Sequence, residues 1–233
     1  MDFLTLDWKG VMLALVFGVI FIVLGLMLGY FFLGLMIAFL VLSAIVTYMG
    51  WNYKKKRNLG QSSRGFKNVL ANGLPPIIMV VIFYLFMISN NSTYALLAAI
   101  GFMASVAAIT SDKFSSEIGI LDGQPTMLLG FRKVKKGTSG AITWLGLVAG
   151  LIGSFIIAAL VLVVRAPLGT FAGIYGFTIA KAILVIGMAG FIGCLVDSIF
   201  GYYEEKGIGN KYTSNFICGI AGALVAILIF MII

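Results

Sequence analysis

Long apolar runs, interrupted by short polar segments, make up most of the chain. Many of these runs reach or approach about 20 residues, the length at which a helix crosses a hydrocarbon core of roughly 30 Å. The stretch 10–50 is too long for one crossing, and Gly29-Tyr30 near its middle predicts a tight helical hairpin. The pattern predicts seven transmembrane helices, at about 10–28, 31–50, 68–88, 94–110, 139–164, 170–196 and 215–233.

The composition agrees with a membrane protein. Hydrophobic residues make up 61% and charged residues 10% of the 233 residues, whereas soluble domains carry about 25% charged residues. We therefore expect an all-α integral membrane protein with a single polytopic domain over residues 1–233. The chain has no histidine, which excludes His-based acid/base catalysis, Ser-His triads and the usual zinc sites. Cys194 and Cys218 lie in apolar segments, so we expect no disulfide and no metal thiolate.

Lysine and arginine residues gather in alternate connecting segments. Fourteen of the sixteen lie at Lys9 or in the segments 54–67, 111–138 and 197–214. Because these residues mark the cytoplasmic side of short loops, the N-terminus and these segments are predicted to be cytoplasmic. The net charge of +8 then reflects topology and attraction to anionic lipid headgroups and phosphates. Nucleic-acid binding is not implied, and we expect a multi-pass protein of the cell membrane.

Three carboxylates lie at or just beyond a predicted membrane boundary: Asp112, Glu117 and Asp197. Charges at bilayer depth are costly, so acids in such places are functional candidates. Carboxylates among many basic residues suit Mg²⁺ and a polyphosphate. Asp112 and Glu117 are five residues apart, about 140° around an ideal helix, so they diverge unless the helix ends or bulges. Asp112 shares a face with Ser116, whereas Glu117 shares one with Lys113 and could form an ion pair with it.

The segment "KVKKGTSGAITWLG", residues 133–146, is a second candidate. Gly137 and Gly140 flank Thr138 and Ser139 just before a predicted helix. Small residues with exposed amides at a helix N-terminus can cradle phosphate. The alternative is that Thr138 or Ser139 is an ordinary N-cap.

The segment "ANGLPP", residues 71–76, interrupts an apolar helix near its cytoplasmic end. Pro75 and Pro76 predict a kink or a break, because each removes a backbone donor. Asn72 either stabilises that kink or binds a ligand.

Lys181 lies about ten residues from either end of the predicted helix 170–196. Three roles are open for it: pairing with an acid, binding a lipid phosphate, or extending to the membrane interface.

Several of these segments match one known family. "SDKFSSEIG" resembles its Asp-Thr-x-x-Ser-Glu-x-Gly signature, and "VKKGTSGAIT" resembles Val-x-x-Gly-Thr-x-Gly-x-x-Thr. "GCLVDSIFG" resembles Gly-x-x-x-Asp-Ser-x-x-Gly, and "RGFKNVLANG" resembles Arg-x-x-x-x-Val-x-Ala-Asn-Gly. From about residue 60 onward the chain thus resembles the transmembrane protein 19 and phytyl-phosphate kinase family, long catalogued as a domain of unknown function. It is more distantly similar to dolichol kinase and CDP-diacylglycerol synthase.

The resemblance implies a membrane kinase that moves the γ-phosphate of a nucleoside triphosphate, usually CTP, to an isoprenoid monophosphate. The match carries over to these positions: Asn72, Asp112, Ser116, Glu117, Gly137, Thr138, Gly140, Asp197, Ser198 and Asn215. Mg²⁺ on Asp112, Glu117 and Asp197 would bridge the triphosphate. The basic residues expected to offset phosphate charge are Lys133, Lys135 and Lys136, with Arg132 or Arg64. Lys113 stands where the family usually has Thr.

A transporter or flippase for a small ion or a lipid phosphate is the main alternative. Transporters usually show internal repeats and sites near the membrane midplane. Here the acids gather at one face and no clear repeat is present, so we favour the kinase and leave open a homodimer.

Overall fold

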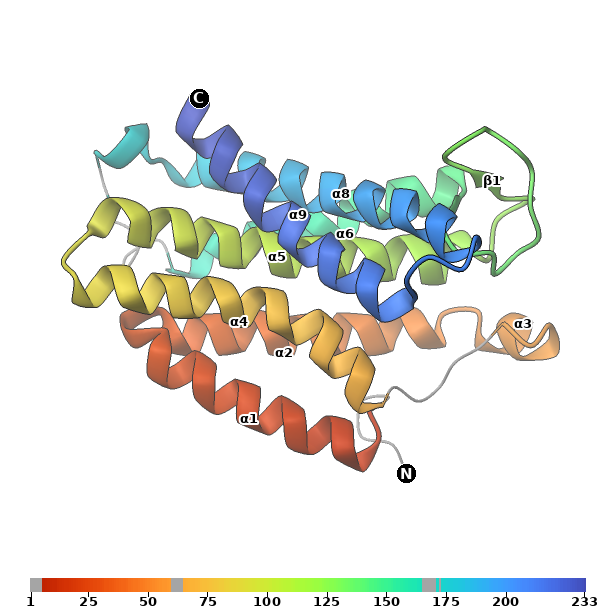
Figure 1. Cartoon of the computed structure of the whole chain (residues 1–233), viewed down its shortest axis with the longest axis horizontal. Coiled ribbons are helices and arrows are strands. Elements are labelled where there is room, and N and C mark those ends of the chain that lie inside the picture. Colours follow the sequence, from red (N-terminus) through yellow and green to blue (C-terminus); the bar gives the residue numbers. More distant parts are fainter. Residues whose placement is uncertain (1–5, 60–64, 165–170, 172) are drawn as a thin grey trace.

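The structure is a computed structural model that describes residues 6–59, 65–164, 171 and 173–233. Its described elements are mostly helices that run along one long axis (Figure 1). The α-helices are α1 (Trp8–Leu24), α2 (Gly29–Tyr48), α3 (Trp51–Lys56), α4 (Phe66–Ile88), α5 (Ser92–Gly119), α6 (Trp144–Ala159), α8 (Ile179–Glu204) and α9 (Lys211–Ile232). Short 3-10 helices span Leu26–Leu28, Leu160–Val164 and Ile174–Gly176, and the two strands are β1 (Thr126–Met127) and β2 (Ala141–Ile142).

Six helical segments are long and apolar enough to cross a membrane, and α1 is a shorter apolar helix of 17 residues. The six segments are Leu26–Tyr48, Phe66–Ile88, Ser92–Gly119, Trp144–Val163, Ile179–Glu204 and Lys211–Ile232. This architecture confirms the prediction of an all-α integral membrane protein with about seven membrane helices.

The turn between α1 and α2 lies earlier than the predicted Gly29-Tyr30. A single 3-10 turn follows Gly25 and leads directly into α2. Glycine permits this close turn, because a Cβ on Gly29 would lie 3.0 Å from the Cα of Ile22. Hydropathy does not locate the turn, since the residues on both sides of it are equally apolar.

α5 is the central helix of the bundle. In its apolar window 89% of the residues are buried, compared with 39–44% in the other five segments. It packs against α2, α4, α6, α8 and α9. Small residues allow these close approaches: Gly150 of α6 packs on Ser111 of α5, and Gly190 of α8 packs on Ala107. The result is a firmly held helix that carries Asp112 to one end of the bundle.

Four buried phenylalanines join α1, α2 and α4 to α5. The ring of Phe102 lies 5.5 Å from that of Phe21 and 4.2 Å from that of Phe32, and Phe32 lies 5.5 Å from Phe83. Lipid tails are as apolar as these rings, so the stabilisation in a bilayer comes from tight packing rather than from removal from water.

α4 continues as one helix through Pro75 and Pro76, so the chain does not break there. Both prolines are buried. Gly219 of α9 makes room for this segment, because a Cβ at Gly219 would lie 2.8 Å from the Cβ of Pro75. Packing against a neighbouring helix thus supports a helix that has lost two backbone donors.

α6 begins at Trp144, later than the predicted start near residue 139. Thr143 is its N-cap, and its Oγ1 accepts a hydrogen bond of 3.1 Å from the Gly146 amide. The residues just before the cap form β2, which pairs with β1 in antiparallel register. Thr138 and Ser139 are therefore not N-caps, and that alternative is wrong.

α8 begins at Ile179, so Lys181 lies in its first turn rather than in the middle of a span. Thr178 caps the helix by accepting a hydrogen bond of 3.1 Å from the Lys181 amide. The ammonium of Lys181 lies 4.6 Å from the centre of the Phe230 ring. The misplacement arose because the apolar residues of the 3-10 helix Ile174–Gly176 and Phe177 extend the hydropathy signal although α8 begins only at Ile179.

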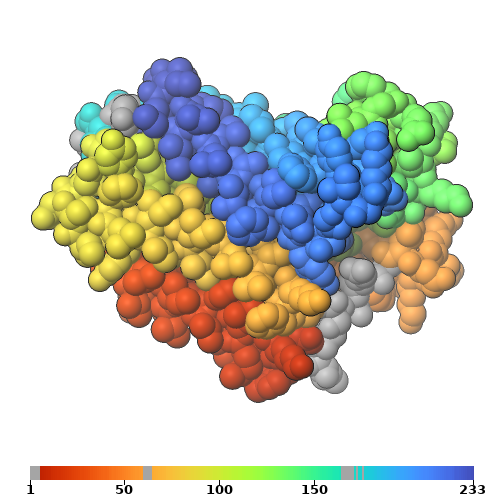
Figure 2. All heavy atoms as spheres, in the orientation of Figure 1, coloured from red at the N-terminus to blue at the C-terminus, as the bar shows by residue number. Residues whose placement is uncertain are grey.

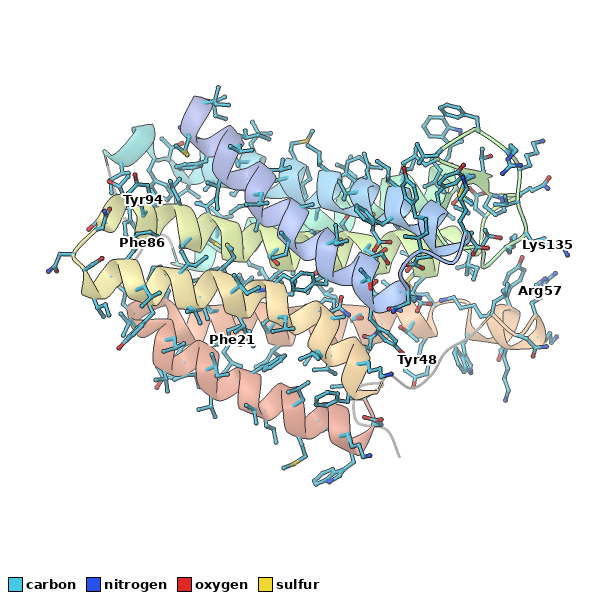
Figure 3. All side chains as sticks on the ribbon, in the orientation of Figure 1. Phe21, Tyr48, Arg57, Phe86, Tyr94 and Lys135 are labelled. Carbon is cyan, nitrogen blue, oxygen red and sulfur yellow. The ribbon has the colours of Figure 1, made fainter. Side chains whose placement is uncertain are left out.

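One end of the bundle gathers most of the polar connections. α2, α5 and α8 end there, α4, α6 and α9 begin there, and α3 and the strand pair lie beside them (Figure 1). Figure 2 shows α3 in orange and the segment around residues 120–140 in green projecting at this end. Arg57 and Lys135 lie here, whereas Phe86 and Tyr94 mark the opposite end (Figure 3). We call this end the polar end.

Candidate functional site

A cavity of about 430 Å³ lies at the polar end, between α5, α8, α9 and the segment 119–143. Most of the residues predicted for the site line it. They are Asp112, Ser116, Glu117, Lys136, Gly137, Thr138, Gly140, Asp197, Ser198 and Asn215. The fold thus brings residues from four segments of the sequence, α5, the segment 119–143, α8 and α9, around one polar space.

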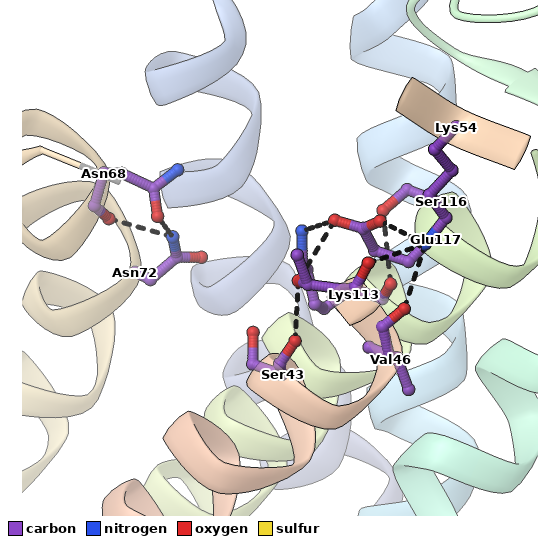
Figure 4. Close-up of polar contacts among 9 residues, drawn as sticks. Ser43, Val46, Lys54, Asn68, Asn72, Lys113, Ser116 and Glu117 are labelled. Atoms are coloured by element: carbon purple, nitrogen blue, oxygen red, sulfur yellow. Dashed lines mark hydrogen bonds and ion pairs between the residues drawn. The ribbon is translucent and has the colours of Figure 1, made fainter. Parts of the chain in front are cut away.

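A second, narrow cavity of about 20 Å³ adjoins the first, and Asn72 lines it with Asn68, Phe39 and Ile109. The amide nitrogen of Asn72 donates to the backbone oxygen of Asn68 at 2.9 Å and to its side-chain oxygen at 3.1 Å (Figure 4). The side chain therefore holds the first turns of α4 together and also borders the cavity. The two cavities share Asp112, Lys113, Ser116, Lys211 and Asn215.

Asp112 on α5 and Asp197 on α8 line the same cavity, and each carboxyl group is close enough to influence the other electrostatically. Oδ1 of Asp197 is buried and has no hydrogen-bond partner among the described residues. Oε1 of Glu204, two turns later on α8, is also buried without a partner in the described chain. A buried carboxylate oxygen without a partner is costly, so this arrangement favours a bound cation.

Glu117 lies in a different environment, although it is only five residues beyond Asp112. Its Oε2 lies 2.8 Å from the ammonium of Lys54, a residue with no exposed surface. Its Oε1 pairs with Lys113, with which it shares a helix face (Figure 4). The same oxygen accepts a hydrogen bond of 3.3 Å from Thr47. Lys54 also donates to the backbone oxygen of Val46 at 3.0 Å. Glu117 thus joins α5 to the end of α2 and to α3.

The expected divergence of Asp112 and Glu117 is confirmed, because α5 continues without interruption to Gly119. Within the described residues, no group of three or more His, Cys, Asp or Glu side chains is arranged to hold a metal ion. Two of the three predicted metal ligands, Asp112 and Asp197, therefore lie together, and a ligand role for Glu117 stays a prediction.

The glycine loop, residues 137–140, forms one wall of the large cavity. Gly137 and Gly140 have φ angles of +88° and +74°, which suit glycine. Gly140 also packs on α8, because a Cβ there would lie 2.7 Å from the amide nitrogen of Tyr202. The loop is held by two acids at the end of α8: Ser139 donates its amide to Glu205 at 2.8 Å and its hydroxyl to Glu204 at 2.7 Å.

Asp122 connects the end of α5 to the start of α6. Its carboxylate accepts a hydrogen bond of 2.7 Å from the Gly123 amide and one of 3.2 Å from the Leu145 amide. These two bonds, the first more than the second, lower the pKa of Asp122 below its ordinary value. The carboxylate thereby supplies an acceptor at the N-terminus of α6 in addition to the Thr143 cap.

The basic residues predicted to offset phosphate charge differ in whether they line the cavity. Lys136 lines the large cavity, but its ammonium donates to the hydroxyl of Tyr53 at 2.7 Å and to the backbone oxygens of Ile120 and Asp122. Arg132, Lys133 and Lys135 are exposed and do not line the cavity. Arg64 lies outside the described residues.

Several wall residues were not predicted. Lys211 and Ser214 lie on the first turn of α9, and Glu204 lies at the end of α8. Helical spacing could have found Lys211, because it lies one turn before Asn215. The buried Lys54 had no such signal, because its partner Glu117 is 63 residues away in the sequence.

The residues at the cavity fit the Mg²⁺ ion that the motif resemblance implies. Mg²⁺ is usually bound by one or two carboxylates together with water and phosphate oxygens. Asp112 and Asp197 supply such a pair, and the buried Oδ1 of Asp197 has no competing partner in the described chain.

Comparison with protein-family models gives a match over residues 2–231, nearly the whole chain, to an integral membrane protein family. The chain belongs to the DUF92 family. The description of the family as integral membrane proteins agrees with the helical architecture of this DUF92 protein.

Curated relatives of this DUF92 protein come from an archaeon and a plant. An uncharacterized membrane protein of Methanocaldococcus jannaschii is 36% identical over 87% of this chain and 77% of its own length. Protein PGR of Arabidopsis thaliana is 30% identical over 70% of this chain and 60% of its own. Protein VTE6, chloroplastic, of the same plant is 32% identical over 60% of this chain and 40% of its own. No solved structure matches the chain.

Proposed function

We propose that this DUF92 protein is a membrane-embedded kinase. It transfers the γ-phosphate of a nucleoside triphosphate, with CTP favoured, to a prenyl or phytyl-type monophosphate and forms the diphosphate. The observation that carries the proposal is the buried, unpartnered Oδ1 of Asp197 beside Asp112, in a polar cavity at the end of an apolar bundle. The motif resemblance to the phytyl-phosphate kinase family supports the choice of reaction.

The position of the cavity suits two substrates with different solubility. Its large part is lined by polar side chains and the glycine loop, and it lies beside exposed loops. Its narrow extension also contacts Phe39 and Ile109, apolar residues of two membrane helices. A nucleotide can approach from water, while the tail of a lipid phosphate stays among the helices.

The reaction needs little covalent chemistry from the protein. An oxygen of the lipid monophosphate attacks the γ-phosphorus, and the bond between that phosphorus and the β,γ-bridging oxygen breaks. The nucleoside diphosphate leaves with the electron pair of that bond. The attacking phosphate oxygen is already ionised near neutral pH, so no histidine base is required.

Each group of wall residues has a role in this proposal. Asp112 and Asp197 hold Mg²⁺, which when bound neutralises charge on the phosphate oxygens. Thr138 and the loop amides of Gly137 and Gly140 hold the phosphates of the donor. Ser116 and Asn215 border both cavities, Asn72 borders the narrow one and Ser198 the large one, and these four side chains orient the reacting groups.

Transfer of label is the direct test of the proposal. The purified full chain is incubated with Mg²⁺, one γ-labelled nucleoside triphosphate (CTP, ATP, GTP or UTP) and prenyl monophosphates of several chain lengths. We expect label to appear in a lipid diphosphate, with CTP the best donor. If no donor gives a labelled lipid while the same protein moves a lipid phosphate or an ion across vesicles, the transporter alternative replaces the kinase.

We also propose that the cavity faces the cytoplasm, because the polar end carries most of the basic residues. Gly123→Cys introduces a thiol at this end, where a side chain has open space, and Ser92→Cys introduces one at the exposed start of α5. The native cysteines are buried and do not interfere. An impermeant thiol reagent should label the thiol at 123 only from the cytoplasmic side and the thiol at 92 only from the other side. The reverse pattern contradicts this orientation.

A further inference from the structure

Three lysines line the two cavities: Lys113, Lys136 and Lys211. Lys113 pairs with Glu117. Lys136 donates three hydrogen bonds, to a tyrosine hydroxyl and two backbone oxygens. Both ammonium groups are therefore committed to holding the protein together, and binding a phosphate would cost them these partners.

Lys211 differs from the other two. It is the first residue of α9 and is solvent-exposed. Asn210 caps the helix by accepting from the amides of Tyr212 and Thr213, so the side chain of Lys211 has no part in the cap. Its ammonium makes no hydrogen bond and no ion pair with the residues that the structure describes. It lies close enough for its charge to act on both Asp112 and Asp197.

In the proposed kinase, Lys211 lies where the donor and the acceptor meet. It borders the large cavity and also the narrow one, together with Asp112 and Asn215. In phosphoryl transfer, negative charge is spread over the three equatorial oxygens of the group in transit, and a nearby cation stabilises it. A lysine ammonium suits this task because it is a compact charge on a flexible stem.

We infer that Lys211 is a catalytic residue that binds the phosphoryl group as it passes from the nucleotide to the lipid phosphate. This inference rests on the proposed kinase function. It replaces the expectation that Lys133, Lys135 and Lys136, with Arg132 or Arg64, offset the phosphate charge.

A simpler role for Lys211 is to balance the two neighbouring carboxylates. The two roles predict different results. Charge balance is needed most in the absence of Mg²⁺, so its loss would lower the melting temperature of the unliganded protein. Phosphate binding is needed only with a ligand, so its loss would lower anion affinity and leave the unliganded melting temperature unchanged.

The test compares Lys211→Met with Lys206→Met in the purified full chain. Lys206 is a matched control because it is exposed, lies only five residues before Lys211, and contacts Tyr202 rather than the cavity. Calorimetry measures the affinity for Mg²⁺-CTP and for inorganic pyrophosphate with Mg²⁺. We expect Lys211→Met to weaken both by roughly 10- to 100-fold, the usual loss for a charge-assisted hydrogen bond, and Lys206→Met to change neither.

A second variant, Lys211→Cys, allows the positive charge to be restored after the protein has folded. Lys211→Cys is purified and then aminoethylated, which rebuilds a lysine-like ammonium at that position only, because Cys194 and Cys218 are buried. Anion affinity should be low before the reaction and should recover after it. If Lys211→Met does not fold, the gain on aminoethylation gives the same information.

The outcomes separate this inference from the proposed function. If the wild type transfers phosphate and Lys211→Met keeps its kcat/KM and its pyrophosphate affinity, the inference is overturned and the kinase stands. If the wild type transfers no phosphate but Lys211→Met abolishes pyrophosphate binding, the phosphate-binding role stands and the kinase proposal fails. A lower melting temperature without any loss of anion affinity assigns Lys211 to charge balance alone and overturns the inference.

Discussion

Two acidic environments lie five residues apart on α5, and they differ in how their oxygens are satisfied. Both oxygens of Glu117 have partners, including Lys54, which is completely buried. Around Asp112 the situation is the opposite, because its neighbour Asp197 has a buried oxygen without a partner among the described residues. A carboxylate whose hydrogen-bond and ion-pair partners all belong to the protein stabilises the fold. A carboxylate that lacks such partners is available to bind a ligand.

The comparison also indicates why both environments are tolerated at a membrane boundary. Breaking a buried ion pair by removing one partner is costly because the remaining charge is left in a poor solvent. Glu117 avoids the cost of an unpaired buried charge because Lys54 and Lys113 both pair with it. At Asp112 and Asp197 two carboxyl groups lie close together, and the buried Oδ1 of Asp197 has no partner among the described residues. In the proposed function a bound cation supplies that partner.

The largest expected effect is on phosphate transfer by Asp112→Asn. An amide oxygen carries no net charge and holds Mg²⁺ poorly, so the rate of label transfer to lipid should fall on the order of 100-fold or more. The melting temperature should be unchanged or higher, because a like-charge contact is removed. Full Mg²⁺-dependent transfer by this variant would show that Asp112 does not hold the ion, which contradicts the proposed difference between Asp112 and Glu117.

The next largest effect is on stability and comes from Lys54→Met. Glu117 would keep Lys113 but lose its buried partner, so we expect a loss of about 2–4 kcal/mol in the free energy of unfolding. The double variant Lys54→Met with Glu117→Leu should recover only part of this loss, since it removes the buried carboxylate but also takes the Glu117 partner away from Lys113. Denaturation measured in the same detergent checks both values. An unchanged stability in Lys54→Met would mean that the buried pair does not hold α2 and α3 to α5.

Much of this fold could be predicted from the sequence, because a membrane helix needs only a sufficient apolar length. The same property hides where a helix starts. Apolar residues before Thr178 and small residues before Thr143 look helical by hydropathy, but the hydroxyl caps set the true starts at Ile179 and Trp144.

The candidate site was predictable in part for a similar reason. Asp112, Thr138 and Asp197 could be found because each lies in a short motif, Asp112 and Asp197 at the end of an apolar run and Thr138 just before one. Lys54 could not, because nothing in the local sequence connects it with Glu117, 63 residues away. Spacing on α5 did show that Asp112 and Glu117 diverge, but which of them would find a partner depends on the tertiary packing of α2 and α3.

A pair of threonine variants gives a moderate effect and separates the cavity from the helix cap. Thr138→Val removes a hydroxyl from the cavity wall, so affinity for Mg²⁺-CTP should fall roughly 10-fold while the melting temperature stays constant. Thr143→Val removes the N-cap of α6 and should cost about 1 kcal/mol of stability. Nucleotide titration and thermal melts compare the two directly. If instead Thr138→Val lowers the melting temperature and Thr143→Val weakens nucleotide binding, Thr138 stabilises the fold and does not bind the nucleotide.

The smallest effect concerns acid stability and Asp122. Its pKa is lower in the folded protein than in the unfolded chain, so its carboxylate contributes stability above about pH 4, the unfolded value. That contribution is lost as the pH falls through the lower folded-state pKa. Asp122→Asn should therefore show a shallower fall in melting temperature below about pH 4 than the wild type. If the melting temperatures of Asp122→Asn and the wild type fall in parallel with pH, the hydrogen bonds from Gly123 and Leu145 do not depend on the charge of Asp122.

The most direct test of the contrast between the two environments is the shift in melting temperature that Mg²⁺ produces in three proteins: the wild type, Asp197→Asn and Glu117→Gln. A cation that binds only the folded state raises the melting temperature, and the shift grows with its concentration. We predict a clear shift in the wild type, none in Asp197→Asn despite a normal starting temperature, and a preserved shift in Glu117→Gln from a lower starting temperature. A preserved shift in Asp197→Asn together with its loss in Glu117→Gln would contradict the account.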